Sequence, residues 1–88
     1  MVWHYIAWDG KVGARTEAGK IEPVRAVPSA RGGERFIPES APDDVLFCVV
    51  WDGNKYRPWG WATRDEFPAL RRAYGRVDII APDFAQLG

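Results

Sequence analysis

Residues 45–51, with the sequence VLFCVVW, are apolar at every position. Because successive side chains of a strand point to opposite faces, this run has no polar face and predicts a central strand covered on both sides. The turn Asp-Gly-Asn-Lys follows and predicts a hairpin. Either Asp-Gly or Gly-Asn can form its tip. We favour Gly-Asn, because it pairs Trp51 with Tyr56 and Asp52 with Lys55.

The return strand of this hairpin is predicted at residues 56–62, YRPWGWA. In the favoured register, three of its side chains share one face with Leu46, Cys48 and Val50 of the first strand: Arg57, Trp59 and Trp61. This face would combine planar indole rings with a guanidinium group, a mixture that is typical of protein interfaces and of sites that bind single-stranded nucleic acid.

The first third of the chain predicts three further strands. Residues 2–8, VWHYIAW, end at an Asp-Gly turn, and a second strand is expected at about 11–17. A third extended stretch covers residues 21–27, where Pro23 cannot donate to a sheet ladder and therefore favours an edge or a bulge. The only histidine, His4, shares a strand face with apolar residues, and we expect it to be packed there.

A helix is predicted over residues 64–74. Thr63 and Glu66 match a capping box at its start, and Gly75 is a natural residue to end it. Pro68 leaves a second start open, because proline is tolerated only in the first turn. We therefore predict a single α+β domain, residues 1–88, with a small, mainly antiparallel, twisted sheet of about five or six strands. A small barrel that the helix closes at one end is the alternative.

Composition limits the kinds of partner. Twelve basic and twelve acidic residues cancel, so no net charge attracts nucleic acid, and direct nucleic-acid binding is not favoured. Five Trp, three Tyr and four Phe are many aromatic residues for an 88-residue interior, which favours some exposed aromatic surface and a protein partner. No nucleotide-binding glycine motif is found, so no cofactor is predicted.

A single cysteine and a single histidine exclude a disulfide framework and a four-ligand zinc site within one chain. Cys48 lies within the apolar strand and is predicted to be a buried thiol. The alternative is an intermolecular disulfide that joins two copies into a homodimer, which requires that strand face to be exposed. Because the sequence lacks a secretory signal and an apolar run of membrane-spanning length, we expect a cytoplasmic protein without membrane contact.

Six side chains in the second half of the chain form the predicted partner-binding surface: Arg57, Trp59, Trp61, Arg64, Arg71 and Arg72. Two structural explanations compete for these residues. They can form an aromatic and basic interface, or the tryptophans can pack under the helix while the arginines line its outer side. No metal site is predicted among them.

The segment from Asp44 through the hairpin to Phe67, which ends in GWATRDEF, resembles the C-terminal half of small phage-type nucleases of the PD-(D/E)xK family. The resemblance covers about 24 residues and implies a mixed sheet. In that family the preceding strand carries an acidic residue and a lysine, and here it reads IEPVR, with Glu22 and Arg25. Arginine is a poor substitute for the compact lysine charge that such a site needs, so the catalytic motif is degenerate.

The resemblance implies an origin in a phage or another mobile element. Together with the missing catalytic set, it favours a non-catalytic interaction protein that docks on a nucleic-acid-handling or defence complex and inhibits it, in the manner of anti-CRISPR proteins. One alternative is a divergent metal-dependent nuclease that uses Asp9, Glu22 and Arg25. Another is a small module that binds single-stranded nucleic acid.

Overall fold

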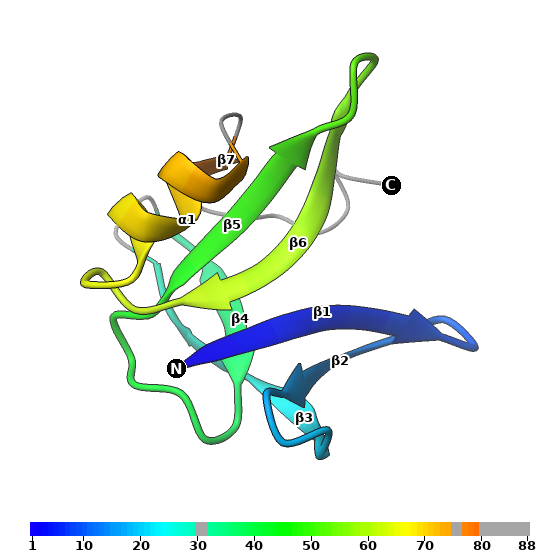
Figure 1. Cartoon of the computed structure of the whole chain (residues 1–88). Coiled ribbons are helices and arrows are strands. Elements are labelled where there is room, and N and C mark those ends of the chain that lie inside the picture. The colour runs from blue at the N-terminus through cyan, green and yellow to red at the C-terminus, as the bar shows by residue number, and fades with distance from the viewer. Residues whose placement is uncertain (30–31, 75–76, 80–88) are drawn as a thin grey trace.

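The computed structural model describes residues 1–29, 32–74 and 77–79. The elements in chain order are β1 (Val2–Trp8), β2 (Lys11–Thr16), β3 (Ile21–Pro28), β4 (Glu34–Pro38), β5 (Leu46–Trp51), β6 (Tyr56–Ala62), α1 (Phe67–Tyr74) and β7 (Val77–Ile79). The strands form one sheet in the order β4-β3-β2-β1-β6-β5-β7, and every described pair is antiparallel (Figure 1). The α+β prediction is confirmed, whereas the mixed sheet implied by the nuclease resemblance is not observed.

The β5–β6 hairpin has the favoured register. Trp51 pairs with Tyr56, and their ring centroids lie 5.0 Å apart. The backbone N–H of Asp52 donates to the carbonyl of Lys55 at 3.1 Å, which closes the turn around Gly-Asn. The turn chemistry and the aromatic cross-strand pair thus set the register from local sequence alone.

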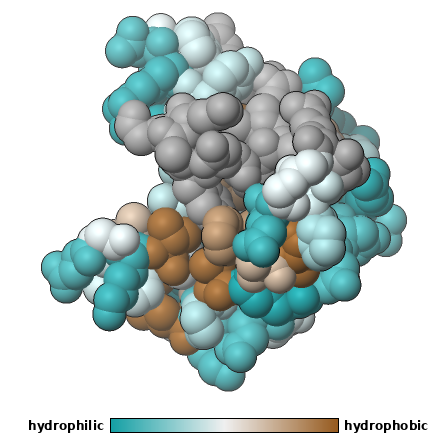
Figure 2. Space-filling model, turned by 180° about the vertical axis from the view of Figure 1, so that it is seen from behind, coloured by the Kyte–Doolittle hydropathy of each residue, from teal (hydrophilic) through white to brown (hydrophobic). Residues whose placement is uncertain are grey.

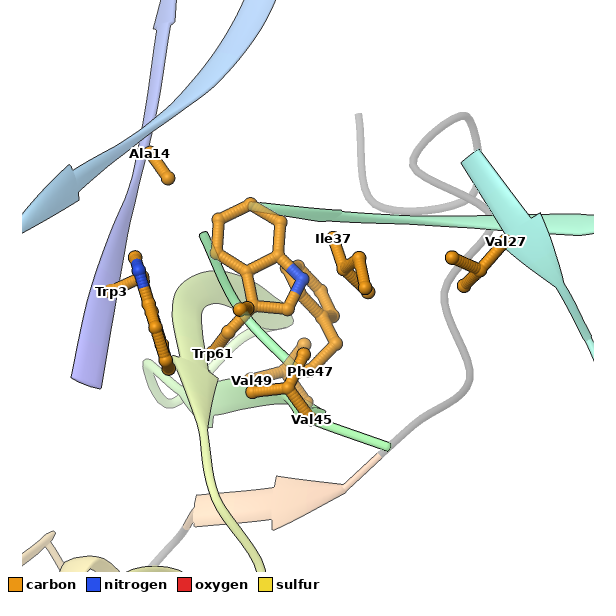
Figure 3. Packing of buried hydrophobic residues seen from close by; sticks show 9 residues of the cluster. Trp3, Ala14, Val27, Ile37, Val45, Phe47, Val49 and Trp61 are labelled. Atoms are coloured by element: carbon orange, nitrogen blue, oxygen red, sulfur yellow. The ribbon is translucent and has the colours of Figure 1, made fainter. Parts of the chain in front are cut away.

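The sheet curls around an interior that β4 closes from the side opposite β6. The indole N–H of Trp61 donates to the backbone carbonyl of Phe36 at 3.1 Å, and this bond connects β6 to β4 across the interior. Figure 3 shows the Trp61 rings between Trp3 and Ile37. Trp61 also meets Phe47 edge to face, with centroids 5.2 Å apart. The large aromatic residues therefore fill the interior of a half-barrel.

The helix is shorter than predicted and begins at Phe67 instead of residue 64. Glu66 forms the reciprocal half of the predicted cap, because its carboxylate accepts from the Thr63 N–H at 3.1 Å. The Thr63 hydroxyl donates to the same carboxylate at 2.6 Å. The regular helix starts at Phe67, so Pro68 occupies its second position. Proline has no N–H, and it is tolerated there because N–H groups of the first turn have no acceptor within the helix.

One side of α1 packs on the outer face of the sheet, beside β5 (Figure 1). Phe67 and Leu70 contact a small cluster around the buried residues Cys48 and Ala62, and Val2 of β1 joins the same cluster. The helix therefore covers the outer face of β5 and β6. The concave face of the sheet holds the larger core instead.

Candidate interaction surface

The two tryptophans of β6 lie on opposite faces of the sheet, which corrects the prediction that they share one. The register between β5 and β6 shifts between Cys48 and Val49, and Trp59 is the extra residue of a β-bulge. One extra residue reverses the alternation of side chains beyond it. Trp59 packs with the cluster under α1, whereas Trp61 points into the interior and is fully buried. Trp61 is therefore removed from the candidate surface.

The four predicted arginines lie on three segments of the chain: β6, the β6–α1 connection and α1. Arg57 lies on β6, is exposed and forms an ion pair with Asp52 of the hairpin turn. Arg71 and Arg72 are exposed on α1, where the helix dipole favours cations near the C-terminal end. Arg57 and Trp59 lie on the outer face of β6, and Trp59 packs in the same cluster as Phe67 and Leu70 of the helix that carries Arg71 and Arg72.

Arg64 lies within electrostatic range of Arg35 on β4. Burial lowers the pKa of Arg35, the positive charge of Arg64 lowers it further, and the carboxylate of Asp44 opposes both effects. The Arg35 guanidinium donates to the carbonyl of Val45. Arg64 thus belongs to a group of charges at the β4 end of the half-barrel.

Cys48 is fully buried on the strand that faces α1. Burial is the main cause that raises the pKa of its thiol to about 11, while a backbone hydrogen bond from Ala62 opposes the shift and Glu66 adds to it. A protonated, enclosed thiol is a poor nucleophile. The exposure that an intermolecular disulfide requires is absent at Cys48, so this alternative does not fit the fold.

An exposed surface that the sequence did not identify lies on the outer face of β1, β2 and β3. Trp8 is 44% exposed and Ile21 is 54% exposed, although both are large apolar side chains. They line one open groove of about 280 Å³, together with Lys11, Val12, Glu22 and Pro23. Two of the most exposed hydrophobic side chains of the described residues are therefore neighbours across a hollow.

Gly13 lies beneath the Trp8 indole, next to the groove, and pairs with the groove residue Pro23. A Cβ atom at this position would lie 2.8 Å from both Cη2 and Cζ3 of Trp8, so the indole occupies the space that a side chain at Gly13 would fill. Gly13 pairs with Ile6 on one side and with Pro23 on the other. The missing side chain at Gly13 thus leaves room for the Trp8 indole.

Pairing in the sheet shows which residues surround this groove. Partners in an antiparallel register share a face, and the pairs His4 with Arg15 and Arg15 with Ile21 extend the outer face across three strands. We call the following residues the outer patch: His4, Ile6, Trp8, Lys11, Arg15 and Ile21. His4 is exposed, contrary to the prediction that it is packed, and its ring meets Trp59 at a centroid distance of 5.0 Å. This contact links the outer patch to Trp59.

The tips of the two hairpins are more hydrophilic than the surface beside the β1–β2 hairpin. Seen from behind, both hairpins end in hydrophilic atoms, and hydrophobic atoms of the described residues gather beside the base of the β1–β2 hairpin (Figure 2). The turns at the tips hold Asp9 and the segment 52–55. The apolar surface is thus found along the strands and not at their connections.

Of the three residues in the nuclease alternative, Glu22 and Arg25 form hydrogen bonds with other side chains or backbone groups, and Asp9 lies in a turn away from them. Glu22 is buried, and its carboxylate accepts from the backbone N–H and the hydroxyl of Ser40, at 3.1 and 2.5 Å. Arg25 donates to the carbonyl of Ala41 and pairs with Asp43, both at 2.7 Å. Asp9 lies in the β1–β2 turn, beyond the strand residues that pair with β3. Within the described residues, no group of three or more His, Cys, Asp or Glu side chains could hold a metal ion.

Comparisons with protein-family models, with curated proteins and with solved structures find no match to this chain. In the described part of the chain, no helix is both long and apolar enough to cross a membrane. The arrangement of the outer patch is therefore the main guide to function.

Proposed function

We propose that this chain is a non-catalytic interaction protein that docks on another protein through the outer patch. The observation that carries the proposal is the shared groove of Trp8 and Ile21, which are 44% and 54% exposed. Burial of such side chains in a partner removes apolar area from water, and tryptophan is enriched among the residues that dominate binding energy. The groove also provides the concave shape that an interface anchor needs.

The chemistry of the patch fits binding better than catalysis. The lysine and arginine of the patch, Lys11 and Arg15, occupy exposed strand positions, and the carboxylate of Glu22, which lines the groove, serves Ser40. The resemblance of residues 44–67 to phage-type nucleases supports a partner within a nucleic-acid-handling or defence complex of the host. In this proposal the chain blocks or modulates that complex by occupying one of its surfaces.

Quantitative affinity capture tests the proposal. The intact chain is compared with the double variant Trp8→Ala and Ile21→Ser, and with Tyr56→Ala as a matched control. Tyr56 is 40% exposed but lies on the β5–β6 hairpin, away from the outer patch. We expect the intact chain and the control to enrich the same host protein, and the double variant to lose it. Equal enrichment by all three folded proteins would show that the outer patch is not the docking surface.

A further inference from the structure

The outer patch combines a largely apolar groove with two cations, Lys11 in its lining and Arg15 on the strand position that pairs with Ile21. Lys11, Gly13 and Arg15 follow one another on the outer face of β2, because alternate residues of a strand share a face. Lys11 lines the groove and pairs with Trp8, and Arg15 lies next to the groove because it pairs with the lining residue Ile21. The two cations are four residue steps apart, which corresponds to about 13 Å along an extended strand.

No carboxylate occupies an outer strand position of β1 to β3. Along β1, β2 and the part of β3 that pairs with β2, the outer positions are Val2, His4, Ile6, Trp8, Lys11, Gly13, Arg15, Ile21 and Pro23. The Glu22 side chain points the other way, since Glu22 pairs with the interior residue Ala14. Neither Lys11 nor Arg15 forms an ion pair with another described residue.

We propose that the outer patch binds an extended acidic segment of the partner protein that carries one large apolar side chain between two carboxylates. This inference rests on the proposed function and names the chemistry that it requires. The apolar side chain enters the groove between Trp8 and Ile21, and the carboxylates meet Lys11 and Arg15. In an extended peptide, side chains two residues apart share a face. The matching pattern is therefore acidic residue, any residue, apolar anchor, any residue, acidic residue.

A single-stranded nucleic acid is the less favoured occupant. It could stack a base on Trp8, but the groove is also lined by the aliphatic side chain of Ile21 and by Pro23. Aliphatic walls favour an apolar side chain, whereas nucleic-acid affinity depends mainly on the number of phosphates that cations neutralise. Two cations that form no ion pair within the described part of the chain support short contacts with carboxylates better than a phosphate track.

Titration of the ¹⁵N-labelled chain with synthetic probes tests the inference. The first probe is a short peptide with the core Glu-Ser-Phe-Ser-Glu. In the second the Phe is replaced by Ser, in the third both Glu are replaced by Lys, and the fourth probe is a six-nucleotide oligothymidylate. We expect the first peptide alone to shift the Trp8 indole and Ile21 amide signals saturably. Added salt should weaken that binding, because exposed ion pairs are screened.

Charge variants of the protein make the test specific. The double variant Lys11→Gln and Arg15→Gln should weaken the first peptide about five- to tenfold, as the loss of two exposed ion pairs implies. Arg71→Gln with Arg72→Gln removes the same charge from α1 and should leave the affinity unchanged. Equal weakening by both double variants would overturn the assignment of the carboxylates to the outer patch.

The remaining outcomes separate this inference from the proposed function. If the oligothymidylate alone shifts Trp8, or if the Lys peptide binds as well as the Glu peptide, the acidic segment is the wrong occupant. If no probe binds but affinity capture still depends on Trp8 and Ile21, docking stands and the inferred partner chemistry is wrong. If capture is also independent of these two residues, the proposed function fails with it.

Discussion

The Trp8 indole lies over Gly13 of the neighbouring strand, at a position where a Cβ atom on Gly13 would be 2.8 Å from two of the ring carbons. This contact holds a large exposed side chain in one place without burying it in the core. An anchor that is fixed before binding loses less conformational entropy when a partner arrives. The relation of Trp8 to Gly13 is therefore the structural basis of the outer patch.

The variant Gly13→Ala tests this relationship directly. The new methyl group must displace the Trp8 ring, and it would also lie 3.2 Å from the backbone carbonyl oxygen of Glu22. We expect a change of less than about 1 kcal/mol in the free energy of unfolding, because the partly exposed Trp8 ring can move aside and alanine restricts the unfolded chain. The Trp8 indole signal should move in the NMR spectrum while the signals of the buried Trp61 stay in place. An unchanged Trp8 signal would mean that the indole does not rest on Gly13.

The variant Gly60→Ala should be far more damaging. Gly60 adopts φ = 154°, and a Cβ atom there would lie 2.0 Å from the backbone carbonyl oxygen of Trp3. Because backbone atoms of two paired strands cannot separate without breaking the sheet, we expect a loss of about 3 kcal/mol or more in urea unfolding. Gly53→Ala is the matched control, since Gly53 also has positive φ but has no atom within 4 Å of such a Cβ. Similar losses for both variants would contradict the close approach of β1 to β6.

These two glycines also explain what the sequence could and could not predict. The hairpin register and the capping box were predictable, because the turn residues, the Trp51–Tyr56 pair and the Thr63–Glu66 cap are local chemistry. The bulge at Trp59 depends on the approach of β1 to Gly60, which is a contact between distant segments. A prediction from simple alternation, which contains no bulge, therefore placed Trp61 on the outer face with Trp59 instead of in the interior.

The outer patch was missed for a related reason. The exposure of Trp8 depends on which strand pairs with β2 and on where that pairing ends, and neither follows from periodicity. Glycines inside the two strands were the available signals. An isolated glycine in a strand indicates a bulge or a close approach, and Gly60 and Gly13 show one of each kind.

Cys48 should be unreactive in the folded protein. Burial raises the pKa of its thiol to about 11, so the thiol remains protonated at pH 8, and the side chain is also enclosed. We expect a disulfide reagent such as Ellman's reagent to react slowly with the native chain and stoichiometrically in denaturant. The molecular mass in solution should be the same with and without reductant. Rapid labelling of the native protein, or a dimer that reductant dissociates, would contradict the buried position.

Acid should weaken the β5–β6 hairpin through Asp52. Backbone hydrogen bonds from Lys55 and Asn54, followed by the Arg57 side chain, lower the pKa of Asp52 to about 2, from an ordinary value of 3.8. Because the folded-state pKa is the lower one, this contribution to stability is complete above about pH 4 and disappears as the pH falls toward 2. Asp52→Asn should therefore flatten the decline in melting temperature over this range. A decline as steep as that of the unaltered chain would rule out this role for Asp52.

The central claim is that the outer patch is covered when the chain docks, and hydroxyl-radical footprinting of the captured complex tests it most directly. Trp8 and Tyr56 serve as reporters within one molecule, because they are 44% and 40% exposed in the free chain but lie on different hairpins. We predict that complex formation protects Trp8 and Ile21 from oxidation while Tyr56 is oxidised as in the free chain. Protection of Tyr56 with unchanged oxidation of Trp8 would contradict the claim.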